Sequence, residues 1–119
     1  MSRSNLRMAV IVLTAITLVI HAFIGVTSLG APDMGTLAIL WVLNALGYLG
    51  LLLAFLGYIP FFKGAIVEWA LIAFAVVTII AWVVMSGVLK PGYHDVLAYI
   101  TKVDELLLIV ATFMHIRSA

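Results

Sequence analysis

Four long apolar stretches make up almost the whole chain, and they limit the folds that it can adopt. They cover residues 6–28, 35–59, 64–89 and 95–116. A helix needs about 20 mostly apolar residues to cross the roughly 30 Å of hydrocarbon in a bilayer. All four stretches reach that length, so we predict four membrane-spanning helices.

The composition supports a location in the lipid bilayer. Hydrophobic residues make up 66% of the chain and charged residues only 9%, whereas soluble domains carry about 25% charged residues. So few charges cannot cover a surface that faces water. The net charge of +1 provides no basic patch, so we expect no nucleic-acid partner. The absence of cysteine excludes disulfides and thiolate metal sites.

Short turn-forming segments separate the apolar stretches. Gly30 and Pro32 follow the first stretch, the segment PFFKG at 60–64 follows the second, and KPG at 90–92 follows the third. These connections leave no room for a water-soluble domain. The fold class expected is therefore all-α, with residues 1–119 forming one antiparallel bundle of four transmembrane helices.

The basic residues predict the orientation of the bundle. Arg3, Arg7, Lys63 and Arg117 fall on one side of the predicted membrane, and Lys90 falls on the other. Lysine and arginine are enriched on the cytoplasmic side. We therefore expect both termini to be cytoplasmic, in a multi-pass protein of a prokaryotic-type cytoplasmic (inner) membrane.

Beyond Asp95 at its first position, the fourth stretch carries three charges, Lys102, Asp104 and Glu105. Its purely apolar part, 106–114, would extend only about 14 Å as a helix, so a spanning helix must include the charges. We expect Lys102 to extend along its aliphatic stem to the surface. The alternative is an interfacial helix up to Asp104, followed by a short span.

A layer of polar side chains is predicted in the outer half of the bundle. At 100° per residue, His21 shares a helix face with Thr14 and Thr17, and Glu105 shares one with Thr101 and Thr112. Glu105 is therefore expected to face the interior within reach of His21. The full predicted site consists of His21, Asn44 and Glu105, with Asp104 and Lys102 at its edge and Tyr48 and Trp82 in its wall.

This polar layer has a structural and a functional interpretation. Polar residues between membrane helices commonly hold helices together, but ionisable residues inside a membrane also mark sites for protons, ions or ligands. Glu68 lies in the first turns of the third predicted helix, where the helix dipole favours a carboxylate. We interpret it as structural, with Lys63 or Arg117 as its expected partner.

The histidines restrict the cofactors that the chain can hold. His21 and His115 lie towards opposite ends of the bundle and His94 lies in an outer loop, so no pair could ligate a haem within one chain. A tetrapyrrole on a single histidine (haem or chlorin) or a quinone stays open. His21, Asp104 and Glu105 lie on only two helices, and we predict no metal site.

Two functions follow from these features. The first is a non-enzymatic accessory or assembly subunit of a larger membrane complex, of respiratory or photosynthetic type, whose partners are other membrane subunits or copies of the chain. The alternative is a proton- or ion-coupled or cofactor-binding protein, since His21 and Glu105 are residue types that exchange protons. Its site would be built on His21, Asn44 and Glu105.

Three segments resemble small four-helix membrane proteins of bacteria and archaea. They are HAFIG at 21–25, LNALGYLGLLLAF at 43–55 and GYHDVLAYITKVDELLLI at 92–109. The resemblance implies the four-helix membrane architecture, and it carries no activity.

Overall fold

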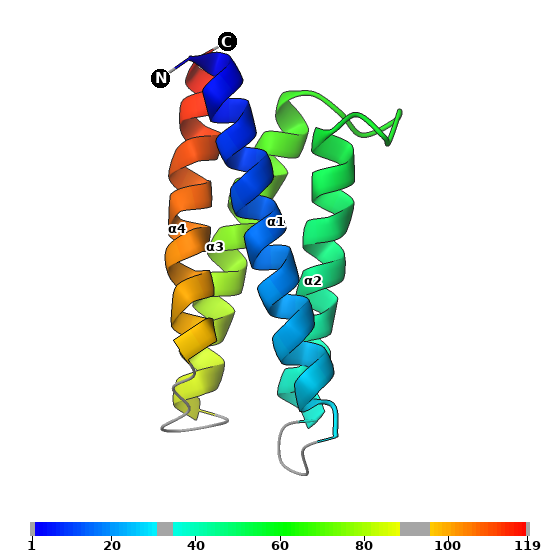
Figure 1. Cartoon of the computed structure of the whole chain (residues 1–119), viewed down its shortest axis with the longest axis vertical. Coiled ribbons are helices and arrows are strands. Elements are labelled where there is room, and N and C mark those ends of the chain that lie inside the picture. Colours follow the sequence, from blue (N-terminus) through cyan, green and yellow to red (C-terminus); the bar gives the residue numbers. More distant parts are fainter. Residues whose placement is uncertain (1, 31–34, 89–95, 119) are drawn as a thin grey trace.

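The computed structural model describes residues 2–30, 35–88 and 96–118, which form an all-α bundle. Its helices are α1 (Arg3–Ser28), α2 (Gly35–Phe55), α3 (Ala65–Val88) and α4 (Val96–Arg117). Figure 1 shows them side by side along one long axis, with both termini at the same end. The all-α, four-helix prediction is confirmed.

Local sequence explains where the helices begin and end. The Ser2 hydroxyl caps α1 by accepting a hydrogen bond from the backbone N–H of Asn5 at 3.1 Å. The second helix ends at Phe55 instead of residue 59, so the predicted boundary was wrong. Gly57 adopts a φ of +92°, and the N–H groups of Gly57 and Tyr58 donate to carbonyls of the last turn. This is a Schellman arrangement, which needs a left-handed residue and ends the helix before Pro60.

Each helix packs against two neighbours, in the cyclic order α1, α2, α3 and α4. Of the four neighbouring pairs, α2 and α3 pack least closely. We call the end that holds Arg3 and Arg117 the terminal end, and the opposite end, where α1 ends and α4 begins, the distal end (Figure 1).

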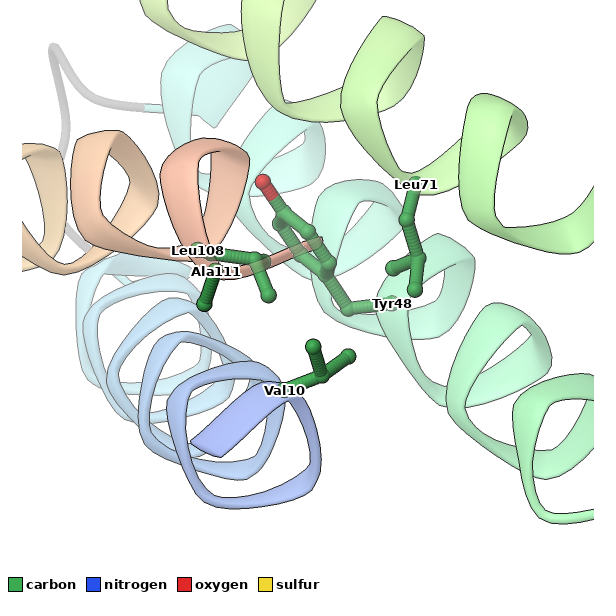
Figure 2. Close-up of a cluster of buried hydrophobic side chains, with 5 residues drawn as sticks. All are labelled: Val10, Tyr48, Leu71, Leu108 and Ala111. Atoms are coloured by element: carbon green, nitrogen blue, oxygen red, sulfur yellow. The ribbon is translucent and has the colours of Figure 1, made fainter. Parts of the chain in front are cut away.

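The interior contains two clusters of apolar side chains. One consists of Val10, Tyr48, Leu71, Leu108 and Ala111, from all four helices (Figure 2). The other lies nearer the distal end and consists of Ile24, Leu37, Trp41 and Ala98. Polar side chains are buried along the same interior, so the core is not purely apolar.

Among the described residues, three helical segments are long and apolar enough to cross a membrane: Arg3–Ser28, Gly35–Phe55 and Ala65–Met85. Their apolar side chains are exposed along much of their length, as with Leu43 on α2 and Val77 on α3. The charges of α4 distinguish it from these three.

Candidate functional site

All three charged side chains in the first half of α4 point into the bundle. Glu105 is fully buried, and Lys102 and Asp104 are each 7% exposed. Glu105 thus occupies the interior face predicted from its helical position. The expectation that Lys102 extends to the surface was wrong. Its Nζ donates to Glu105 Oε1 at 2.6 Å, one turn along the same helix.

Pairing explains why Lys102 stays inside. In a low-dielectric interior, an ammonium group and a carboxylate in direct contact attract each other far more strongly than in water. Two aromatic rings add to this, because Nζ lies 5.4 Å from the ring centre of Trp41 and 5.9 Å from that of Trp82. Cation–π contacts of this kind favour a desolvated cation.

The second carboxylate oxygen of Glu105 is held by α2 and lies near α1. The Tyr48 hydroxyl donates a hydrogen bond to Oε2 of Glu105. The Nε2 atom of His21 lies 3.9 Å from the same oxygen. Tyr48 is fully buried, and it reaches Glu105 from the helix diagonally opposite α4. Both oxygens of Glu105 therefore have hydrogen-bond donors inside the bundle.

The ring of His21 is fixed by its own helix and by aromatic neighbours. Nδ1 lies 2.8 Å from the carbonyl oxygen of Thr17, and the hydroxyls of Thr17 and Thr101 are 2.7 Å apart. The ring centre is 4.6 Å from that of Trp41 and 5.5 Å from that of Tyr48. Thr17 and Thr101 join α1 to α4 at this site. Their helical faces were apparent in the sequence, but the predicted site did not include them.

Among the described residues, Asn44 does not contact Glu105 directly but bonds to Thr78 of α3. Its Oδ1 accepts from the Thr78 hydroxyl at 2.8 Å, and its Nδ2 donates to the carbonyl of Leu40 at 2.9 Å. Asn44 therefore faces α3, and it lies in the wall of the same cavity as His21. Asp104 is buried on a different face of α4 from Glu105, and its Oδ2 has no hydrogen-bond partner within the described part of the chain.

A cavity of about 40 Å³ lies beside His21, Asn44 and Lys102. Its polar and aromatic lining consists of His21, Trp41, Asn44, Thr78, Trp82 and Lys102, and its apolar lining of Leu37, Leu40, Ala81 and Met85. A water molecule requires roughly 10–15 Å³ on this scale, so the cavity has room for about three. The indole Nε1 of Trp82 is buried, and no acceptor for it occurs among residues 2–30, 35–88 and 96–118.

A second buried polar pair lies at the terminal end. Glu68 of α3 and His115 of α4 contact each other through Oε1 and Nδ1. The expected partners of Glu68, Lys63 and Arg117, were therefore wrong. His115 lies about as far from the end of α4 as Glu68 lies from the start of α3, so the antiparallel packing of α3 and α4 brings the two side chains together.

A family model matches residues 1–115 of the chain, nearly its full length. The chain belongs to DUF7475, a family of unknown function. No curated protein matches it, and neither does any solved structure. The expectation of a resemblance to small proteins that carry no assigned activity is thereby confirmed.

The geometry of this DUF7475 protein limits what the distal site can hold. The cavity is far smaller than the roughly 300–1,000 Å³ typical of pockets that enclose a whole ligand, so the haem or chlorin considered from the sequence does not fit. Within the described residues, no group of three or more His, Asp or Glu side chains could hold a metal ion. His94 lies outside the described residues. The site suits a polar head group or a few water molecules.

Proposed function

We propose that this protein is an integral membrane protein whose distal cavity binds the polar head of a lipid-soluble molecule of the quinone class. The observation that carries this proposal is the buried indole N–H of Trp82, which lacks an acceptor among the described residues and belongs to the same cavity wall as Lys102. A carbonyl oxygen in the cavity would accept hydrogen bonds from such donors. Buried donors without acceptors are rare, since each one carries a desolvation cost.

The position of the cavity supports access from the lipid. Its apolar lining comes from α2 and α3, the neighbouring helices that pack least closely. Further towards the terminal end, a Cβ on Gly47 would lie 2.3 Å from the Phe74 ring, so this side chain fills the space between α2 and α3 there. A head group entering between the distal halves of α2 and α3 would reach the polar lining and leave its apolar tail in the lipid.

The buried ion pair also supports a functional site. Desolvating an ammonium and a carboxylate costs several kcal/mol for each ion, which a pair in good geometry only partly regains. Ionisable groups at such depth in a membrane are usually functional. In our proposal, Lys102 and His21, which line the cavity, bind the polar end of the ligand, and Glu105, which accepts a hydrogen bond from Tyr48, positions Lys102.

Replacing Trp82 by phenylalanine tests the proposed ligand contact. The substitution keeps an aromatic ring but removes the N–H donor, which has no acceptor among residues 2–30, 35–88 and 96–118. We expect the affinity for a decyl-substituted benzoquinone, measured calorimetrically with the protein in neutral detergent, to fall about two- to tenfold, the equivalent of one hydrogen bond.

Trp69→Phe is the matched control, because Trp69 lies on the same helix, is 50% exposed and packs against Phe113. Decylbenzene, which lacks carbonyls, should bind more weakly than the quinone and equally to both variants. Equal quinone binding by Trp82→Phe and Trp69→Phe would contradict the proposed contact.

For the membrane topology, we propose that all four helices cross the bilayer with both termini cytoplasmic. The 22 residues of α4 would extend about 33 Å at 1.5 Å per residue, and its charges have partners inside the bundle. Arg3, Arg7 and Arg117 gather at the terminal end, as the positive-inside rule expects of a cytoplasmic face.

Single introduced cysteines test this topology, since the chain has none of its own. Ser118→Cys places a thiol at the terminal end and Gly30→Cys places one at the distal end, where an added Cβ has no atom of the described residues within 4 Å. In intact cells, we expect a membrane-impermeant maleimide to label Gly30→Cys and to leave Ser118→Cys unlabelled until the cells are lysed. The reverse pattern would invert the proposed orientation.

The accessory-subunit function stays a prediction. The exposed apolar faces of the first three helices suit lipid and neighbouring protein helices alike. A stable set of larger membrane proteins that copurifies in mild detergent would support a subunit function. A protein that purifies alone with a bound lipid-soluble molecule would support the ligand-binding function instead.

A further inference from the structure

We infer that the terminal end contains a second binding site, for a phosphate group, formed by Arg3 and Arg7 at the mouth of a separate cavity. This cavity has a volume of about 200 Å³. Side chains from all four helices line it, including the two arginines of α1, Phe55 of α2, Glu68 of α3 and His115 of α4. The inference does not depend on a ligand at the distal site.

The two arginine side chains line the same cavity. Arg3 and Arg7 are four residues apart on α1, and residues at this spacing are neighbours on one helix face. Both side chains are exposed, and both line the cavity. Guanidinium groups recognise phosphate through paired N–H donors in a fixed plane.

The existing contacts of Arg3 and Arg7 leave their charges available. Arg3 donates to the His115 carbonyl at 2.7 Å and to the Ser118 hydroxyl at 2.9 Å, which holds it in place through neutral acceptors. The Arg7 guanidinium lies 5.0 Å from the ring centre of Phe55. In the described part of the chain, neither arginine forms an ion pair with a carboxylate.

Glu68 is the one carboxylate in the lining of this cavity, and it is engaged by His115. Glu68 therefore contacts His115 and not the arginines. The two guanidinium groups outnumber this single carboxylate, so the cavity lining has an excess of positive charge. The first turn of α1 contains no acidic residue to offset them. A cavity of about 200 Å³ has room for a phosphate group together with several waters, at roughly 10–15 Å³ for each water.

A phosphate group at this position has two sources, the head group of an anionic phospholipid and a soluble phosphate. Basic pockets between helices on the cytoplasmic side of membranes are typical sites for anionic lipid head groups. The chemistry of recognition is the same for both sources, so the experiment has to separate them.

The test uses the full-length protein in neutral detergent, with its thermal unfolding midpoint as the readout. Short-chain phosphatidylglycerol, short-chain phosphatidylcholine and inorganic phosphate are titrated separately at constant ionic strength. We expect phosphatidylglycerol or phosphate to raise the midpoint in a saturable manner, because a ligand that binds only the folded state stabilises it. Saturation by phosphatidylglycerol alone identifies a lipid head group, and saturation by phosphate identifies a soluble source.

Arg7→Gln is the informative variant, since the Arg7 guanidinium lies over the Phe55 ring and forms no hydrogen bond or ion pair within the described part of the chain. We expect the apparent affinity to fall about tenfold or more, as for the loss of one charge-assisted hydrogen bond, and to fall less in Arg7→Lys. Arg117→Gln is the matched control, because Arg117 stacks on Phe113 at the same end and lies outside the cavity lining. Equal affinities in Arg7→Gln and Arg117→Gln, or no saturable response to phosphatidylglycerol or phosphate, would overturn the inference.

Discussion

Replacing Lys102 by methionine should destabilise the protein by about 3–5 kcal/mol, the cost typical of removing one partner of a buried ion pair. Methionine fills a similar volume but leaves Glu105, which is fully buried, without its cation. The remaining donor to Glu105 is Tyr48, and His21 lies 3.9 Å away. The free energy of unfolding, measured by denaturant titration in mixed micelles, checks the prediction.

The variant Lys63→Met is the matched control, because Lys63 is an exposed lysine outside the helices. It should change the free energy of unfolding by less than about 0.5 kcal/mol. The double variant Lys102→Met/Glu105→Gln should recover much of the lost stability, since replacing both members of a buried pair is often nearly neutral. If Lys102→Met were as stable as Lys63→Met, the ion pair would not contribute to the fold.

Replacing Gly25 by alanine should destabilise the bundle by about 1–3 kcal/mol, the usual cost of overpacking. A Cβ at this position would lie 2.6 Å from Val42 Cγ2 and 2.8 Å from the Val42 backbone nitrogen. Backbone atoms cannot move aside as a flexible side chain can, so α1 and α2 would have to separate. Because Trp41, next to Val42, packs on His21, the separation should also loosen the distal site.

Gly50→Ala is the matched control for Gly25→Ala. Gly50 also lies within a helix, but a Cβ there meets no atom within 4 Å. Alanine favours the helix over glycine by up to about 1 kcal/mol, so this variant should be as stable as the parent or slightly more stable. A similar loss of stability in both variants would show that close packing at Gly25 is unimportant.

The two candidate sites are separated by the apolar cluster of Val10, Tyr48, Leu71, Leu108 and Ala111 (Figure 2). Tyr48 belongs to this cluster through its ring and to the distal site through its hydroxyl. Glu105 and His115 are ten residues apart on α4, which corresponds to about 15 Å along the helix. Substitutions at Arg7 and at Trp82 should therefore act independently of each other.

The sequence alone was sufficient to predict the four helices and the interior position of Glu105. Helix number follows from the length of the apolar stretches and from the turn residues between them, which are local properties. The face of Glu105 follows from the 100° helical period, together with its distance from the ends of α4. The end of α2 was placed too late, because a glycine within an apolar run, Gly57, ends the helix through its backbone conformation.

Only the tertiary structure decided which polar groups meet. Helical periodicity gives the direction of a side chain on its own helix, but the neighbour it meets depends on the order and register of the packed helices. That packing brings Tyr48 across the bundle to Glu105, turns Asn44 towards Thr78, and pairs Glu68 with His115. Lys102 stays inside for the same reason, because Glu105 and the rings of two tryptophans from α2 and α3 surround its ammonium group.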